Sequence, residues 1–295
     1  MPTATETLTE PPDEEALDAL RRTAADVLGI TDLHQGQIDA MLAASQGHDV
    51  LAVMPTGYGK SAIYEVVGAL DRALTVVVSP LIALQRDQVR ALGEASGGPR
   101  AAALNSSLSA KATDELWRNT RAHKVGYLFL SPEQLASPDV VERLAALEIG
   151  RIAVDEAHCV SAWGHDFRPD YLAIGAVVEQ LGHPVVIALT ATAAPPVREE
   201  VVERLGLRQP VVVVRGFDRP NLELNVRRHT SAAEKERALT EEAVERVREG
   251  AGSGVGLVYV ASRRQTEEYA TVLREEGIRA SPYHAGMPSK DRNSV

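Results

Sequence analysis

The chain has 295 residues, of which 44% are hydrophobic and 24% are charged, so it is long enough to bury one large core or two smaller ones. Its single cysteine, Cys159, excludes an internal disulfide framework and a zinc cluster built on several cysteines. No apolar run approaches the ~20 residues that span a bilayer, and the N-terminal residues lack the basic and apolar regions of a signal peptide, so we expect a cytoplasmic protein without a membrane partner.

The net charge of -10 argues, taken alone, against a nucleic-acid partner, because a basic surface supplies most non-specific affinity. The charge is unevenly distributed, however. Residues 1–20 hold six acidic residues and no basic one, which leaves a net charge of -4 for the remainder. Residues 80–130 hold seven Lys or Arg against four Asp or Glu. A locally basic face and a scatter of solvated charges both remain open.

The predicted elements begin with residues 1–15, an acidic leader that we expect to be disordered and to run into a helix ending at Gly29. Short runs rich in Val, Ile and Leu follow, most of them separated by stretches of helical length. These runs are residues 49–53, 74–79, 125–130, 151–155, 184–190 and 210–214. Because they are apolar at nearly every position, they predict strands buried on both faces of a parallel sheet covered by helices. Residues 16–215 are therefore expected to form one doubly wound α/β domain.

A second cycle of elements begins after that domain. A helix is predicted at 233–249, a strand at 255–260, a helix from about Ser262 and a strand at 278–283. We expect residues 216–295 to be a linker followed by an incomplete second α/β unit.

The segment "MPTGYGKSAIYE", residues 54–65, follows the first predicted strand. Backbone N–H groups of such a glycine-rich turn point at an anion, and the dipole of the following helix favours negative charge there. We expect Lys60 to reach the β and γ phosphates of a nucleotide and Ser61 to offer its hydroxyl to Mg²⁺. Met54 stands where the strict phosphate-loop pattern has glycine, so a chance Gly-Lys-Ser after a strand is the alternative interpretation.

Two acidic residues follow the predicted strand "RIAV". Asp155 and Glu156 are expected at the carboxyl end of the sheet, the edge where ligands of open α/β sheets bind. Asp155 is then suited to hold Mg²⁺, and Glu156 to orient or deprotonate the attacking water. A solvated acidic turn is the alternative.

Taken together, these segments resemble a superfamily 2 helicase. "DEAH" at 155–158 is preceded by "PTGYGKS" and followed by "ALTATA", and "AVDEAHCVSAWGHDFRPDYLAIG" (153–175) is similar to the RecQ family of ATP-dependent DNA helicases. Further similar segments are residues 30–41, 76–89, 127–135, 217–222 and 259–287. The resemblance implies two RecA-like lobes of the P-loop NTPase class, the first complete and the second partial. It also implies ATP and Mg²⁺ as ligands, with no zinc in this chain.

The resemblance assigns roles to individual residues around the nucleotide. Gln37 matches the glutamine that reads adenine, which is chemically sensible because a Gln amide can pair with adenine N6 and N7. The nucleotide-binding loop comprises Thr56, Gly57, Tyr58, Gly59, Lys60 and Ser61. His158 is placed to bond either the γ-phosphate side or two threonines, Thr190 and Thr192, which resemble the motif linking hydrolysis to strand displacement. Local capping is the alternative for these threonines.

The stretch after the acidic box resembles an aromatic-rich loop that senses single-stranded DNA. The matching positions are Trp163, His165, Asp166, Phe167 and Arg168. Stacking of bases on aromatic side chains contributes about 1–3 kcal/mol per base without demanding a sequence. Packing of Trp163 and Phe167 in a core is the alternative, although their neighbours are polar and turn-prone. In the second unit Ser262, Arg263, His284 and Gly286 resemble contacts to the DNA backbone.

The whole resemblance implies a monomeric DNA helicase that moves 3′ to 5′, acts on single-stranded and partly duplex DNA, and is nucleoid-associated if bacterial. An RNA helicase and a nucleotide-gated binding module are the alternatives. The sequence ends before the motifs for the arginine that the second lobe normally supplies, and such an arginine is worth about 10³–10⁵ in rate. We therefore expect this chain to bind Mg²⁺-ATP, to hydrolyse it feebly and not to unwind duplex by itself.

Overall fold

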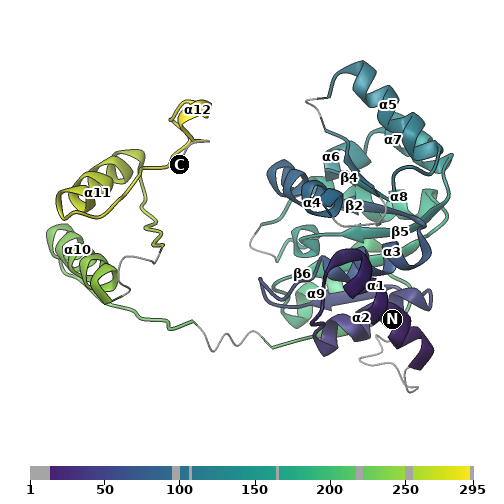
Figure 1. Cartoon of the computed structure of the whole chain (residues 1–295), viewed down its shortest axis with the longest axis horizontal. Coiled ribbons are helices and arrows are strands. Elements are labelled where there is room, and N and C mark those ends of the chain that lie inside the picture. Colours follow the sequence, from purple (N-terminus) through teal and green to yellow (C-terminus); the bar gives the residue numbers. More distant parts are fainter. Residues whose placement is uncertain are drawn as a thin grey trace. The chain divides into compact units, whose positions relative to one another are not determined.

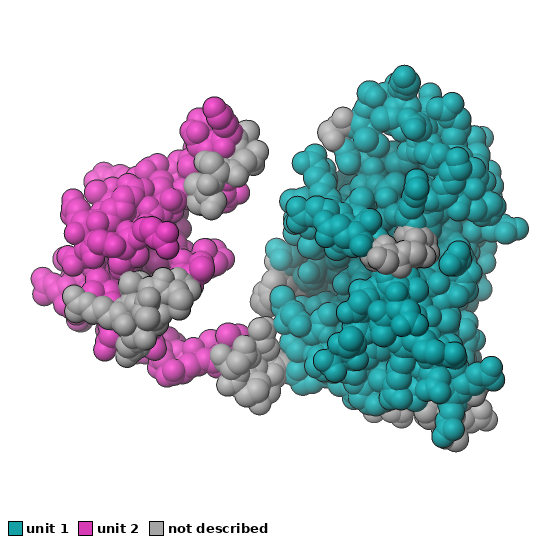
Figure 2. Space-filling model, viewed as in Figure 1, with its two compact units in different colours: residues 1–218 teal, residues 219–295 magenta. Residues whose placement is uncertain are grey.

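The computed structural model describes residues 14–94, 100–105, 108–163, 166–216, 222–249 and 255–292. It divides the chain into two compact units, Met1–Asp218 and Arg219–Val295, which Figure 2 shows in different colours. Most of the leader predicted at residues 1–15 lies outside the described residues, and so does His165. Within the described residues, only the first unit contains strands.

A seven-stranded parallel sheet forms the centre of the first unit, in the order β3-β4-β2-β5-β6-β1-β7. Its strands are β1 (Val50–Val53), β2 (Leu74–Val78), β3 (Ala101–Ala103), β4 (Tyr127–Leu130), β5 (Ile149–Val154), β6 (Val185–Thr190) and β7 (Val211–Val214). Six of them fall on the apolar runs, so the doubly wound parallel sheet predicted from the sequence is confirmed. The seventh, β3, was not predicted, because three alanines have weak strand propensity and this edge strand pairs only with β4.

Helices cover both faces of the sheet (Figure 1). One face packs against α1 (Glu14–Leu28), α2 (Gln35–Ser45), α3 (Ala62–Asp71) and α4 (Ile82–Glu94). The other packs against α5 (Ala110–Arg121), α6 (Pro132–Leu135), α7 (Pro138–Ala145), η1 (Ala157–Val160), η2 (Pro169–Ala173), α8 (Ile174–Gln180) and α9 (Pro195–Leu205). Alternate strand residues contribute to the two cores: Val77 faces the first set of helices, while Val76 and Val78 face the second. The strands are apolar at successive positions because both faces are buried.

The second unit contains α10 (Ala232–Glu249), α11 (Arg263–Glu275) and α12 (Ser289–Arg292). The two strands predicted at 255–260 and 278–283 are wrong: the structure has no strand there. Val255, Leu257 and Tyr259 are 95%, 79% and 90% exposed, so no neighbouring strand covers them. A strand requires a partner for its N–H and C=O groups, and an apolar sequence alone does not supply one.

Candidate active site

The register of three neighbouring strands brings the motifs together at the carboxyl edge of the sheet. Strand β6 lies between β5 and β1. Val53 at the end of β1 pairs with Thr190 at the end of β6, and the Met54 N–H donates to the Thr190 carbonyl at 3.0 Å. On the other side of β6, Val154 pairs with Ala188. The phosphate loop, the acidic pair and the Thr190 segment therefore emerge side by side.

The loop after β1 has the backbone of an anion cradle. Gly57 and Gly59 have φ values of 83° and 77°, a left-handed region that favours glycine. Helix α3 begins directly afterwards, with Ser61 at its N-cap position. The Lys60 ammonium donates to the carbonyl of Met54 at 3.1 Å, which holds the side chain back over the loop. The turn can thus present N–H groups and a cation to one anionic ligand.

Lys60 and the acidic pair share one electrostatic environment. Burial lowers the pKa of Lys60, and the nearby Glu156 and Asp155 carboxylates act in the opposite direction. Burial, together with the Glu156 charge, raises the pKa of Asp155 to about 6, against the opposing effects of Lys60 and His158. A buried carboxylate with so little compensation fits a divalent cation, which takes one or two carboxylates and fills its other positions with phosphate oxygens and water.

Glu65, a further acidic residue that the sequence reasoning missed, lies one helical turn beyond Ser61. Burial raises the pKa of Glu65 to about 7, and a hydrogen bond between the side chains of Ser61 and Glu65 opposes this shift. The spacing of four residues places both side chains on one face of α3. The Tyr127 hydroxyl also donates to the Glu65 carbonyl at 2.5 Å. Glu65 therefore orients the hydroxyl that was predicted to meet Mg²⁺.

Gln37 is buried and holds the phosphate loop. Its amide Nε2 donates to the Gly59 carbonyl at 2.8 Å, and its Oε1 accepts from the His34 N–H at 2.7 Å. The rings of His34 and Tyr58 lie 4.4 Å apart between centroids. The N-terminus of α2 thus packs on the tip of the phosphate loop, and the glutamine predicted to read adenine adjoins the predicted phosphate site.

The acidic box continues into a strained turn. Glu156 has a φ of 48°, a left-handed conformation that costs a non-glycine residue about 1–2 kcal/mol. The His158 Nδ1 lies 2.9 Å from the Thr190 hydroxyl and 3.3 Å from a Glu156 carboxylate oxygen. Because the Thr190 hydroxyl donates to the Thr192 carbonyl at 3.1 Å, it accepts from His158, which fixes a proton on Nδ1. His158 thus contacts Thr190 in this structure, and its bond to the γ-phosphate side stays a prediction.

The aromatic residues after the acidic box are exposed. Trp163 is 79% exposed and Phe167 is 42% exposed, so core packing of these rings is excluded. The Arg168 N–H donates to the Cys159 carbonyl at 2.9 Å, which closes the loop at its base. The Arg168 guanidinium reaches the Pro80 carbonyl at 3.5 Å, next to the exposed side chain of Leu81. The segment thus carries two exposed rings, the second followed directly by a cation.

Two buried hydroxyls that the sequence reasoning missed support this loop. Tyr171, which is fully buried, donates to the carbonyl of Asp155 at 2.9 Å. The Ser161 hydroxyl, also fully buried, donates to a carboxylate oxygen of Glu200 at 2.7 Å. Neither pairing carries a sequence signal, because the partners lie 16 and 39 residues apart.

The residues of the second unit that resemble DNA contacts form one cluster within that unit. The Ser262 hydroxyl caps α11 by accepting from the Gln265 N–H at 3.2 Å. His284 Nε2 lies 2.9 Å from a Glu267 carboxylate oxygen, and its Nδ1 accepts from the Gly286 N–H at 3.2 Å. A Cβ added at Gly286 would lie 3.1 Å from the Arg263 guanidinium, so glycine permits this close approach.

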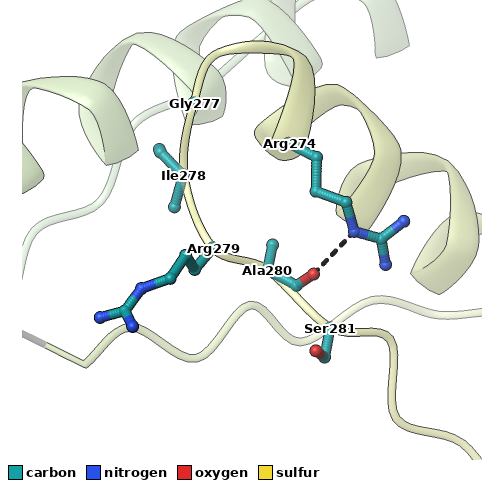
Figure 3. A pocket seen from close by; sticks show the side chains of 6 residues that line it. All are labelled: Arg274, Gly277, Ile278, Arg279, Ala280 and Ser281. Carbon is teal, nitrogen blue, oxygen red and sulfur yellow. Dashed lines mark hydrogen bonds between the residues drawn. The ribbon is translucent and has the colours of Figure 1, made fainter.

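A surface pocket of the second unit lies between the end of α11 and the segment after it. Its lining residues, drawn in Figure 3, are Arg274, Gly277, Ile278, Arg279, Ala280 and Ser281. The Arg274 guanidinium donates to the Ala280 carbonyl at 2.8 Å, while the Arg279 side chain points away from Arg274 (Figure 3). This contact occupies a backbone acceptor in the segment 278–283, where a strand had been predicted.

The described ranges contain neither a cluster of metal-ligating side chains nor a helix fit to cross a membrane. No group of three or more His, Cys, Asp or Glu side chains there is arranged to hold a metal ion. No helix in the same ranges is long and apolar enough to cross a membrane. The absence of such a group of side chains is compatible with a Mg²⁺ site at Asp155, since Mg²⁺ bound with a nucleotide uses phosphate oxygens as ligands.

Comparison with known proteins gives consistent results. Residues 34–201 match the DEAD/DEAH box helicase family. The chain is 39% identical over 275 residues to the probable ATP-dependent DNA helicase RecS of Bacillus subtilis (strain 168), covering 92% of this chain and 53% of that protein. It is 34% identical over 280 residues to the ATP-dependent DNA helicase RecQ of Pasteurella multocida (strain Pm70), covering 94% and 43%. The resemblance to the RecQ family is thereby confirmed.

The chain spans about half the length of these curated relatives. Among solved structures it is similar to the DUF1998 helicase MrfA bound to DNA, with a TM-score of 0.71, 18% identity and coverage of 99% of this chain and 41% of that one. At this level of identity the likeness concerns the fold alone. It supports the RecA-like α/β class predicted from the sequence.

Proposed function

Because the chain belongs to the DEAD/DEAH box helicase family, we propose that it is the ATP-binding motor region of a RecQ-type DNA helicase. The proposed activity couples Mg²⁺-ATP hydrolysis to movement 3′ to 5′ along single-stranded DNA and to duplex unwinding. The observation that carries the proposal is the register of β1, β6 and β5, which brings the phosphate loop with Lys60 and the acidic pair Asp155 and Glu156 to one edge of the sheet. Cation, carboxylates and glycine turn are the groups that a metal triphosphate requires.

The residues have distinct roles in the proposed reaction. Lys60 leaves the Met54 carbonyl to bind the β and γ phosphates, while Asp155 and the Ser61 hydroxyl hold Mg²⁺, which offsets the charge of the phosphates when it is bound. Glu156 orients the attacking water and accepts its proton. His158 connects Glu156 to Thr190, so a change at the γ-phosphate also reaches the Thr190–Thr192 segment.

Gln37 supports the adenine end of the site. We propose that its amide pairs with adenine, and that it exchanges its contact with the Gly59 carbonyl for the base. The phosphate loop is then released from α2 as the nucleotide binds. Adenine recognition and loop opening become one event, since one amide serves both.

The aromatic loop is the proposed contact for single-stranded DNA. Trp163 and Phe167 provide exposed faces for stacking, and Arg168 provides a cation next to them. We propose that His165 also belongs to this contact, and that Ser262, Arg263, His284 and Gly286 bind the DNA backbone from the second unit. The His284 Nδ1 accepts the Gly286 N–H and so shapes the turn, while Arg263 supplies a positive charge for the phosphates.

A binding experiment on the 295-residue chain tests the nucleotide site. We expect a fluorescent ATP analogue to bind in the presence of Mg²⁺ and Lys60→Ala to weaken it about 10- to 100-fold, because charged hydrogen bonds contribute about 1.5–3 kcal/mol. Arg72→Ala, a change on the exposed C-cap of α3, is the matched control and should bind normally. Equal affinities of the parent and the Lys60→Ala variant would contradict the assignment.

The choice of nucleic acid is tested on a protein that contains these 295 residues and has the full length of the curated relatives. ATP hydrolysis should be stimulated by poly-dT more strongly than by poly-U, and Glu156→Gln should abolish hydrolysis while nucleotide binding remains. Stronger stimulation by poly-U would identify an RNA helicase instead. An unchanged phenotype of Glu156→Gln would favour a binding module without motor activity.

A further inference from the structure

Building on the proposed function, we propose that Ser161 and Glu200 form a positioning pair that ties the aromatic loop to helix α9. Through this pair the nucleotide site sets the position of Trp163. Ser161 contributes the hydroxyl and Glu200 the carboxylate, and neither is expected to touch nucleotide or DNA.

The Ser161 hydroxyl makes two hydrogen bonds at the start of the loop. It donates to the Glu200 Oε2 at 2.7 Å and accepts from the Trp163 N–H at 3.2 Å. Ser161 is fully buried, and the Glu200 side chain is only 15% exposed. One hydroxyl thus links a carboxylate of α9 to the backbone of the residue that carries the exposed ring.

Packing of its own ring does not hold Trp163 in place. It is 79% exposed, so packing contributes little to holding residue 163 in place. Within the described residues, the Trp163 N–H bond to Ser161 holds the backbone there, and Glu200 in turn holds the Ser161 hydroxyl. A buried hydroxyl whose acceptor is removed rotates freely or loses its bond, so the loop depends on α9 for its placement.

The same segment is also attached to the neighbouring strand at its other end. His158 contacts the Thr190 hydroxyl at 2.9 Å, and Thr190 ends β6 just before α9 begins at Pro195. The helix η1 (Ala157–Val160) between these two contacts packs in the core that also holds Val197 and Val201 of α9. Because η1 is bound at both ends to one β6–α9 segment, a shift of that segment moves the start of the aromatic loop.

The two oxygens of Glu200 have separate partners, which provides a matched control. The Oε2 accepts from Ser161, whereas the Oε1 lies 3.5 Å from the Arg204 guanidinium, whose side chain is 52% exposed. Arg204→Ala removes the surface ion pair and leaves the Ser161 contact. Glu200→Gln keeps an acceptor for Ser161 and should behave like the parent protein, whereas Glu200→Ala and Ser161→Ala remove the contact.

The experiment measures the coupling between two ligands on the 295-residue chain. The dissociation constant of a fluorescent oligo-dT is measured without nucleotide and with a non-hydrolysable ATP analogue and Mg²⁺. For the parent protein we expect the two constants to differ by about fivefold or more, as is typical of coupled sites. Glu200→Ala and Ser161→Ala should bring this ratio close to one while the affinity for the analogue stays unchanged. Glu200→Gln and Arg204→Ala should keep the parent ratio.

A second measurement does not depend on nucleotide. The chain has two tryptophans, and Trp117 is only 2% exposed, so emission that acrylamide quenches arises from Trp163. Trp163→Phe verifies this assignment. The fast component of Trp163 anisotropy decay should grow in Glu200→Ala and Ser161→Ala, and should match the parent in Glu200→Gln. Circular dichroism and the thermal midpoint establish that each variant is folded.

The outcomes separate this proposal from the proposed function. If the parent binds the analogue and oligo-dT with a ratio of one, or if Glu200→Ala keeps the parent ratio and anisotropy, the pair does not transmit and the proposal is overturned. If the parent binds neither ligand, the proposed function fails; the anisotropy comparison then still decides whether Glu200 positions Trp163.

Discussion

At the amino ends of the strands, both oxygens of the buried Asp49 carboxylate have hydrogen-bond partners. It accepts from the Val186 N–H at 2.8 Å and the Arg208 N–H at 2.7 Å, and it meets the His183 ring at 2.9 Å. At the carboxyl ends, Asp155 accepts one hydrogen bond from the Glu156 N–H at 3.0 Å, and burial raises its pKa to about 6. One sheet therefore carries a fully hydrogen-bonded aspartate at one end and, at the other, an aspartate whose buried charge is only partly compensated.

The difference between the two ends shows how stability and function are divided in this fold. Asp49 ties the start of β1 to the start of β6 and to the loop before β7, so its carboxylate stabilises the folded chain. The opposite end keeps Asp155, Glu65 and the strained Glu156 in positions that cost free energy until a ligand binds. The same substitution at the two ends should therefore have opposite effects.

The largest effect is expected for Asp49→Asn. Asparagine keeps only one acceptor oxygen and places an NH2 group against the partners of the other, so either the Val186 N–H or the Arg208 N–H and His183 lose their acceptor. We expect the free energy of unfolding to fall by about 3–5 kcal/mol, because a buried donor is left unsatisfied and the remaining hydrogen bonds lose their charged acceptor. Urea denaturation at pH 7 measures this. Arg90→Ala, which removes an exposed ion pair with Asp87, is the control and should change stability by less than about 0.5 kcal/mol. A small loss of unfolding free energy in Asp49→Asn would contradict the difference drawn between the two ends of the sheet.

Asp155→Asn should change stability in the opposite direction. Because the pKa of Asp155 is raised from 3.8 to about 6, its charged form destabilises the folded state in the absence of ligand. Two pH units correspond to about 3 kcal/mol, so the variant should be more stable by up to that amount at pH 8. The folded state binds the proton more tightly than the unfolded state. The advantage of the variant should therefore be complete above pH 6 and disappear as the pH falls to about 4.

Urea denaturation of both proteins between pH 4 and pH 8, without nucleotide or Mg²⁺, measures this difference. Asn keeps an oxygen that accepts from the Glu156 N–H, so the backbone contact is not lost. A variant less stable than the parent at pH 8 would show that Asp155 is compensated, and the two ends of the sheet would then be alike.

The smallest effect is expected for Tyr171→Phe, which removes one hydrogen bond to the Asp155 carbonyl. We expect a loss of about 1 kcal/mol, the usual contribution of one neutral hydrogen bond. Tyr64→Phe is the matched control, because the Tyr64 hydroxyl is buried and has no hydrogen-bond partner within the described part of the chain. Its removal should leave stability unchanged or raise it. Thermal denaturation compares the two, and equal losses would contradict the role given to Tyr171.

Much of the fold follows from local sequence patterns. The runs that became β1 and β6 are apolar at nearly every position because both faces are covered, and Gly29 ends α1 with a φ of 71°. The run at 255–260 is also rich in Val and Leu but forms no strand, because strand formation also depends on a neighbour that composition does not reveal, and the more polar run at 278–283 forms none either.

The candidate site was predictable in its chemistry but not in its supporting contacts. Lys60 and Asp155 come from motifs adjacent to strand ends, and parallel strands bring such ends to one edge. The contacts of Gln37 with Gly59, and of Ser161 with Glu200, join residues far apart in the sequence. Many polar pairs are compatible with one sequence, and only the packing of the helices selects among them.

The most direct test of the shared metal-triphosphate site is the Mg²⁺ dependence of nucleotide affinity. The ratio of the dissociation constants of an ATP analogue in EDTA and in Mg²⁺ is measured for the parent protein, Lys60→Ala, Asp155→Asn and the double variant. If both side chains bind one complex, Asp155→Asn should bring the ratio close to one, and the double variant should lose less affinity than the two single losses combined. An unchanged ratio in Asp155→Asn, with strictly additive losses, would show that Lys60 and Asp155 do not serve the same ligand.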